Sequence, residues 1–312
     1  MRVVVNTSSA LSSRSCVNLS SQKPSPFDTV GDSEAIPLMR SYKPTRLGFF
    51  DGHGHAANVW RLTPDTVVKI TSSPHEVFMM EFASSQTSIP IPKIRKCVTR
   101  NDYQYLFMEC IEGDDLYEIW PSLSSERKYS VACTLQNYVQ QLRAVKLPNS
   151  DVPGPIQASG EPLRCEGHHF PDIGAGPFPS YTALTAWYNG RSRLNTLLCD
   201  PSVKDISMIP ESKEFFDDSM PLVFTHGDLS PANIRIGKDG TVWLIDWERA
   251  GAYPQWFEYA NMMAYATKSV NKLWPAGWGE FIPLIAGQYE VQLDFLKKNF
   301  TGIAHYAFDG FD

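Results

Sequence analysis

Two acids and an amide lie close together in the last third of the sequence, and their types suit the transfer of a phosphoryl group. They are Asp228, Asn233 and Asp246. The side-chain oxygens of Asn233 and Asp246 suit Mg²⁺, which takes few protein ligands and completes its shell with water and phosphate. Asp228 is placed to accept a proton, but a carboxyl of ordinary pKa, about 3.9, cannot deprotonate an alkanol beforehand. It would therefore orient the hydroxyl and take its proton late, as a loose phosphoryl-transfer transition state allows.

The residues around these three groups predict a strand, a loop and a hairpin. The apolar run 222–224 ends in a His-Gly-Asp turn, residues 234–236 alternate, and a Lys-Asp-Gly turn leads into the apolar run 242–245. This hairpin is expected to bring Asn233 and Asp246 together. An unpaired carboxylate at the end of so apolar a strand would be costly, so Asp246 should face a cation or solvent. Taken singly, these residues would also fit an ordinary strand-end turn and a surface acid.

With these motifs the chain resembles the aminoglycoside-phosphotransferase family, relatives of the protein kinases. That family has a catalytic loop reading His-Gly-Asp-Leu-x-x-x-Asn, followed by Ile-Asp on the next hairpin. The resemblance covers roughly residues 45 to 300 and looks closest to fungal members. Its other matches are Val67-Val68-Lys69-Ile70, Glu76, the segments 87–92 and 108–113, and Glu258.

The resemblance implies an α+β, protein-kinase-like two-lobed fold with a β-rich N-terminal lobe and a mainly helical C-terminal lobe. Residues 1–40 are expected to be a disordered extension, residues 41–112 a small nucleotide-binding lobe, and residues 113–312 a large helical catalytic and acceptor-binding lobe. The hydrophobic patterns agree with this order. Strands are expected at 46–50, 59–62, 66–70 and 105–108, and helices at 73–83, 125–145, 180–199, 255–266 and 279–298.

The activity that the resemblance implies is Mg²⁺-dependent transfer of the γ-phosphate of ATP or GTP to a hydroxyl of a small molecule. Asp228 would be the catalytic aspartate, and Asn233 and Asp246 the magnesium ligands. Lys69 would hold the α and β phosphates. The same lysine is expected to pair with a glutamate.

Glu76 is the expected partner of that lysine, although it also completes a Ser73-Pro74-His75-Glu76 capping box and could simply cap its helix. Glu81 is its rival. The separation of seven positions between lysine and Glu76 is short for the family.

Two further segments are expected to contact the nucleotide. Gly52 and Gly54 resemble an irregular glycine-rich loop whose backbone amides would cover the phosphates. The backbone from Glu109 to Ile111 would contact the adenine edge, as in the family, with a plain interlobe linker as the alternative. A G-x-x-x-x-G-K-[ST] sequence does not occur, which excludes a P-loop site.

The composition argues against a nucleic-acid partner and favours a reducing compartment. The net charge of -6 and pI near 5.7 lack the basic bias that nucleic-acid binding needs. The six cysteines stand singly, which fits free thiols in a reducing compartment. No run of 18 apolar residues occurs, so no membrane span is expected. A cytoplasmic location is expected. Mitochondrial import is the lesser alternative, because the Ser-rich N-terminus has no acid before Asp28.

Several loop residues bear on the acceptor site. The Pro- and Gly-rich segment 148–179 is either a lid over the acceptor site or disordered. Glu248 and Glu258 would suit a cationic acceptor, or else are structural acids. The histidine pairs at 53 and 55 and at 168 and 169 are interpreted as solvated loop residues rather than metal ligands.

Two other functions fit the same fold. One is a non-catalytic nucleotide-binding or interaction protein, because a fold does not imply an activity. The other is a protein-directed kinase. His-Gly-Asp in place of His-Arg-Asp, and the lack of an Asp-Phe-Gly to Ala-Pro-Glu segment, argue against the protein-directed kinase.

Overall fold

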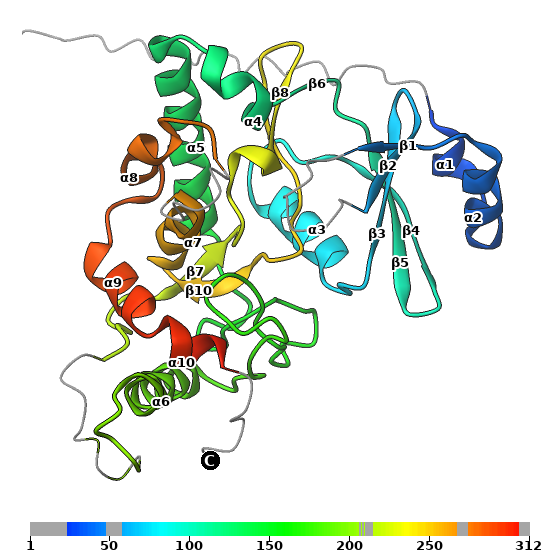
Figure 1. The fold of residues 1–312 in the computed structure, drawn as a ribbon. Coiled ribbons are helices and arrows are strands. Elements are labelled where there is room, and N and C mark those ends of the chain that lie inside the picture. Colours follow the sequence, from blue (N-terminus) through cyan, green and yellow to red (C-terminus); the bar gives the residue numbers. More distant parts are fainter. Residues whose placement is uncertain are drawn as a thin grey trace, which may run out of the picture.

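A computed structural model describes residues 24–47, 58–205, 207, 209, 215–266 and 274–305. It divides into a part built on an antiparallel sheet and a larger, mainly helical part (Figure 1). The expected two-lobed α+β arrangement is therefore confirmed. Gly52 and Gly54 lie outside the described residues, as does most of the expected strand 46–50.

The small lobe contains a five-stranded antiparallel sheet in the order β1-β2-β3-β5-β4. Side chains of successive strand residues point to opposite faces, so neighbouring positions of β3 enter different clusters. Val67 belongs to the apolar cluster that continues into the large lobe, whereas Val68 belongs to a smaller cluster on the other face. Lys69 is two positions beyond Val67 and shares its face. The strands are β1 Thr45–Leu47, β2 Val59–Thr63, β3 Thr66–Thr71, β4 Ile94–Arg100 and β5 Tyr103–Glu109.

The β4 strand was not predicted. Its sequence, Ile-Arg-Lys-Cys-Val-Thr-Arg, carries three basic residues in seven, which hides the apolar alternation. It lies at the edge of the sheet, where charged side chains can reach solvent.

Helix α3 (Glu76–Gln86) covers the face of the sheet that is turned toward the large lobe (Figure 1). It buries Met79, Met80 and Ala83. The predicted capping box is wrong: the helix begins at Glu76 after His75, and no side chain caps it. The carboxylate of Glu76 bonds to a lysine instead, as described below.

The expectation of disorder for residues 1–40 is wrong for residues 24–40, while residues 1–23 lie outside the described part. Helices α1 (Pro26–Thr29) and α2 (Asp32–Ser41) pack beside the sheet (Figure 1). The physical reason is a local cap combined with a buried ring. Ser25 and Asp28 form a capping box, and Phe27 is fully buried and stacks on Phe107 at 4.6 Å.

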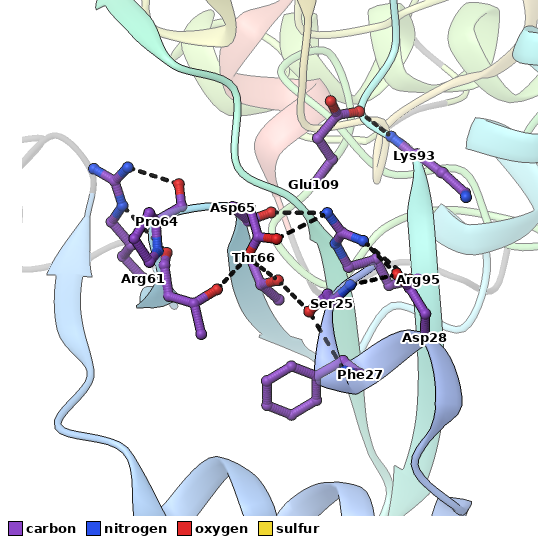
Figure 2. A network of polar contacts seen from close by, with 11 residues as sticks. Ser25, Phe27, Asp28, Arg61, Pro64, Asp65, Thr66, Lys93, Arg95 and Glu109 are labelled. Atoms are coloured by element: carbon purple, nitrogen blue, oxygen red, sulfur yellow. Dashed lines mark hydrogen bonds and ion pairs between the residues drawn. The ribbon is translucent and has the colours of Figure 1, made fainter. Parts of the chain in front are cut away.

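Polar contacts fasten this N-terminal segment to the strands (Figure 2). The hydroxyls of Ser25 and Thr66 lie 2.8 Å apart. Arg95 on β4 donates to both carboxylate oxygens of Asp28, at 3.0 and 2.8 Å. These contacts join α1 to two different strands, so α1 belongs to the small lobe.

Past β5 the chain enters the large lobe, whose helices surround two small sheets. One sheet pairs β7 (Leu222–Thr225) with β10 (Gly251–Pro254), and the other has the order β6-β8-β9. Its strands are β6 Gly113–Asp115, β8 Ile234–Gly237 and β9 Val242–Leu244. The helices are α4 Leu116–Ile119, η1 Trp120–Ser122, α5 Ser125–Ala144, α6 Tyr181–Cys199, η3 Pro231–Asn233, α7 Phe257–Ala266, η4 Trp278–Phe281, α8 Ile282–Ala286, α9 Glu290–Lys298 and α10 Phe300–Ala304.

The predicted helices of this lobe are confirmed with one exception. The pattern at 279–298 predicted one helix, but the structure has η4, α8 and α9, with a break at Gly287, whose φ is 88°. The aromatic residues between the β8–β9 hairpin and α8 belong mainly to the hydrophobic core: Trp247, Trp256, Phe257, Tyr259 and Trp278 are buried. No helix among the described residues combines the length and the apolar character needed to cross a membrane.

Candidate functional site

The predicted hairpin is confirmed, and it joins the motif residues through their backbones. The amide of Ile245 donates to the carbonyl of Asn233 at 3.0 Å. The side-chain amide of Asn233 donates to the carbonyl of Asp228 at 2.9 Å. The loop after β7 and the β8–β9 hairpin are therefore fastened to each other, with Asp246 following directly after Ile245.

Lys69 of β3 reaches across to this hairpin. Its Nζ atom lies 3.0 and 2.8 Å from the two carboxylate oxygens of Glu76, 2.8 Å from Asp246 and 2.8 Å from Glu248. The structure thus pairs Lys69 with Glu76 and not with Glu81, and the short separation between lysine and glutamate is enough. Glu248 was not recognised as a partner of Lys69. Its only signal was its place two residues after Asp246.

This cluster carries more negative than positive charge. Burial alone would lower the pKa of Lys69, but Asp246, Glu76 and Glu248 outweigh it and raise that pKa well above its usual value. Burial raises the pKa of Glu76 to about 7, against the opposing effect of Lys69 and with help from Asp246 and Glu248. Oxygen atoms of the three acids lie within 4.8 Å of one another. Three carboxylates around one ammonium leave room in the charge balance for a divalent cation, so the residues present fit Mg²⁺.

Asp246 has a backbone conformation that is uncommon for a residue with a side chain. Its φ is 66°, in the left-handed region that Asp and Asn tolerate better than other non-glycine residues. This turn ends β9 and directs the carboxylate toward Lys69. Strain of this kind concentrates at functional sites.

Asp228 lies between two nitrogen-bearing side chains. Its Oδ1 atom is 3.2 Å from His168 Nε2, and its Oδ2 atom is 3.6 Å from Arg249 Nη1. Burial would raise the pKa of Asp228, but Arg249, His168 and His226 hold it well below its usual range. The carboxylate is therefore ionised at neutral pH and is a weak base.

The interpretation of His168 as a solvated loop histidine is wrong. Its side chain is only 11% exposed and lies against Asp228 and Arg249. No sequence pattern indicated this contact, because His168 precedes Asp228 by 60 positions and no motif links them.

Glu258, in the first turn of α7, forms hydrogen bonds with the backbone of the loop that carries Asp228. It is buried and accepts hydrogen bonds from the amides of His226, at 2.7 Å, and Gly227, at 3.4 Å. Gly227 has φ 78°, and a Cβ there would lie 2.2 Å from the carbonyl oxygen of Arg249, so no other residue fits. The ring of His226 also contacts the carbonyl of Ile245 at 3.1 Å, which braces the loop against the hairpin.

Replacing Glu258 by Ala is expected to lower the free energy of unfolding by about 2 kcal/mol, because two buried amides lose their acceptor. Glu258→Gln keeps an oxygen acceptor without the buried charge and should stay close to wild type. Chemical denaturation followed by tryptophan fluorescence measures both, with the exposed Glu280→Ala as control. Equal stability of the Ala and Gln variants would contradict the anchoring role.

The two glutamates that suggested a cationic acceptor are both bound within the protein. Glu248 bonds to Lys69 and Glu258 to the Asp228 loop. They therefore give no support to a positive charge on the acceptor.

The segment expected to contact a nucleobase is partly engaged already. The amide of Glu109 donates to the carbonyl of Lys93 at 2.9 Å, and the amide of Cys110 donates to the carbonyl of Asp65 at 2.9 Å. Ile111 is buried and follows directly. These bonds hold the segment at the junction of the lobes. Because the amides of Glu109 and Cys110 already donate to carbonyls, the amide of Ile111 is the candidate donor to a nucleobase.

The Pro- and Gly-rich segment 148–179 is folded, so the alternative of disorder is wrong. Gly154 pairs with Ala252 of β10, and Cys165 pairs with Ala175 within the segment. A pocket lies where the segment meets the Asp228 loop, and both carry part of its wall. It is lined by Glu166, Gly167, His168, Phe170, Gly227, Arg249, Tyr253, Phe257 and Asn261.

Comparison with solved structures shows the same fold in aminoglycoside phosphotransferases. The streptomycin–ATP ternary complex of APH(2″)-IIa is 14% identical, with a TM-score of 0.51 and coverage of 86% of this chain and 84% of that chain. ADP-bound APH(2″)-Ib is 15% identical, with a TM-score of 0.50 and coverage of 85% and 84%. APH(3″)-Id from Streptomyces rimosus is 15% identical, with a TM-score of 0.48 and coverage of 87% and 96%.

Sequence comparison assigns the family. No curated protein matches the chain in sequence. The family model described as "Phosphotransferase enzyme family" matches residues 50–289, which include the Lys69 cluster, the Asp228 loop and the β8–β9 hairpin. The chain therefore belongs to the phosphotransferase enzyme family.

Proposed function

We propose that this protein transfers the γ-phosphate of ATP or GTP to a hydroxyl group of a small molecule, with Mg²⁺ as cofactor. The observation that carries the proposal is the meeting of Lys69 from the small lobe with Asp246 from the large lobe at 2.8 Å. In this proposal residues 41–112 bind the nucleotide and residues 113–312 carry the catalytic loop and the acceptor site. The nucleotides named in the related structures, ATP and ADP, support this choice of co-substrate.

Each residue has a role that its contacts support. Lys69 is held at the lobe junction by Glu76 and would neutralise phosphate oxygens of the nucleotide. Asp228 would orient the acceptor hydroxyl and take its proton late, because its pKa is held well below the usual range. The amide of Ile111 would bind the base, and Gly52 and Gly54 would cover the phosphates.

Asn233 and Asp246 would hold the metal ion, and the proximity of Glu248 to Asp246 makes it a further candidate ligand. Bound there, Mg²⁺ would neutralise charge on the phosphates during transfer. The protein supplies the position of these oxygens, since the β8–β9 hairpin and the φ of Asp246 fix them. A reducing, cytoplasmic setting is proposed with it, and the described cysteines, including Cys165 and Cys199, are free thiols.

Calorimetric titration of ATP and of GTP, each with and without Mg²⁺, tests the proposal. We expect binding of at least one nucleotide that depends on Mg²⁺, because the three acids repel a nucleotide that carries no cation. Absence of binding for both nucleotides would contradict the proposed function. Tight Mg²⁺-dependent binding without any phosphate transfer, either to water or to a panel of hydroxylated small molecules, would favour the non-catalytic nucleotide-binding protein.

A further inference from the structure

A histidine of the 148–179 segment contacts the carboxylate proposed to be catalytic. The Nε2 atom of His168 lies 3.2 Å from Oδ1 of Asp228. The other oxygen of Asp228 faces Arg249 at 3.6 Å. A hydroxyl that is to give its proton to Asp228 must lie within hydrogen-bond distance of one of these oxygens. At Oδ1 the imidazole already takes one hydrogen-bond position.

The position of His168 is built into the fold on both sides of the residue. Before it, Cys165 exchanges two backbone hydrogen bonds with Ala175, at 2.8 and 2.9 Å. After it, the hydroxyl of Tyr188 donates to the carbonyl of His169 at 2.8 Å, and the ring of Phe170 is buried among aromatic residues. The segment is thus fixed around the histidine.

Gly167, directly before His168, has φ 129°, and beyond its chain neighbours no atom lies within 4 Å of a Cβ built there. The residue before His168 therefore has an open side and a glycine conformation, while the imidazole can leave Asp228 by rotation of its own side chain.

The imidazole of His168 can bind Asp228 and Arg249 together. Its Nε2 atom is 3.2 Å from Oδ1 of Asp228, and its Nδ1 atom is 3.3 Å from Arg249 Nη1, which also lies 2.8 Å from Nε2. In neutral imidazole one ring nitrogen donates and the other accepts. With the proton on Nε2, the ring therefore donates to Asp228, and Nδ1 can accept from Arg249. A ligand hydroxyl can offer Asp228 the same kind of donor as Nε2–H.

We propose that His168 occupies the place of the acceptor hydroxyl on Asp228 and keeps water out of it until the acceptor displaces the imidazole. This inference rests on the proposed phosphotransferase function. Its consequence is protection of the nucleotide: without an acceptor, the imidazole and not water lies at Oδ1 of Asp228.

The reaction that His168 suppresses is hydrolysis of the nucleoside triphosphate by water. In it a water oxygen forms a bond to the γ-phosphorus, while the bond from that phosphorus to the bridging oxygen breaks and the nucleoside diphosphate leaves. The water's proton passes to Asp228 and is then released. Water and the nucleotide are the only reactants, so no unnamed partner is needed.

The test is phosphate release from Mg²⁺·ATP and Mg²⁺·GTP in the absence of any acceptor. For His168→Ala we expect phosphate release to rise about tenfold. Water no longer has to displace a hydrogen bond of about 1.4 kcal/mol, and a barrier lower by about that amount gives roughly a tenfold faster reaction. His168→Gln offers a donor for Asp228 and an acceptor for Arg249, so its release should be no higher than that of wild type. Adding Asp228→Asn to His168→Ala should remove the gain.

The exposed Glu161→Ala in the same segment is the control for general loosening and should behave as wild type. An unchanged or lower rate for His168→Ala, with nucleotide affinity intact by calorimetry, would overturn the inference and leave the proposed function standing. An equal rise in His168→Ala, His168→Gln and Glu161→Ala would also overturn it. If wild type binds no nucleotide, the proposed function fails and this inference with it.

Discussion

Replacing Asp228 by Asn is expected to lower phosphate transfer about a thousandfold, because a positioned proton acceptor in the transition state contributes factors of about 10² to 10⁴. An amide of the same shape can still face His168 and Arg249, but it cannot take a proton. Nucleotide affinity should stay close to wild type, because the contacts of Lys69 and Asp246 do not involve Asp228. The measurement is the rate of phosphate transfer from Mg²⁺·ATP or Mg²⁺·GTP to a hydroxylated acceptor found in a screen, because in the wild type without acceptor His168 is proposed to keep water from Asp228.

Asp239→Asn is the matched control for this variant. Asp239 lies exposed in the turn of the β8–β9 hairpin, where its carboxylate accepts from the amide and hydroxyl of Thr241. The same change of charge there should leave transfer unaffected. Equal transfer rates for wild type and Asp228→Asn would contradict the proposed role of Asp228 as proton acceptor.

Replacing Asp246 by Asn is expected to weaken Mg²⁺-dependent nucleotide binding about a hundredfold. Loss of groups that only support a metal ligand already costs about 10- to 100-fold, and Asp246 is proposed as a ligand itself. Asn is preferred to Ala because Asp246 has φ 66°, which Asn tolerates and Ala does not. Binding in the absence of Mg²⁺ should change little or improve, because one of three crowded acids loses its charge.

Calorimetric titration with and without Mg²⁺ measures this effect, and thermal unfolding checks that the variant is folded. The matched control is Asp114→Asn, since Asp114 is an exposed acid on β6 of the same small sheet. Unchanged Mg²⁺ dependence in Asp246→Asn would exclude Asp246 as a ligand and turn attention to Glu76 and Glu248.

The contrast between Glu258 and Glu248 shows how far residue type can mislead. Both are acids that follow the motif, and both suggested a cationic partner outside the protein. In the structure one accepts from two backbone amides, and the other bonds to Lys69. A buried acid needs a partner wherever it lies, and only the packing around it decides whether that partner is a ligand or the chain itself.

The N-terminal segment shows a different kind of limit. Ser-rich composition suggested disorder up to residue 40, yet Phe27 is buried between α1 and the sheet. Phe27 packs there with the buried Ala35 and Ile36 of α2, and the ion pair between Arg95 and Asp28 joins α1 to β4. The average composition of a segment does not indicate whether a few of its side chains pack against the rest of the protein.

The sequence by itself determined the loop that carries Asp228 and the β8–β9 hairpin, and with them the backbone bond of Asn233 to Ile245, directly before Asp246. Those features depend on a tight turn and on alternation between neighbours, which are local properties of the chain. Only the tertiary structure decided which distant groups meet: Lys69 and Asp246 are separated by 177 positions, and His168 and Asp228 by 60. These contacts arise from the packing of two lobes and one long segment around a shared apolar core. Apolar burial is non-directional, so no local pattern specifies which polar side chains it brings together.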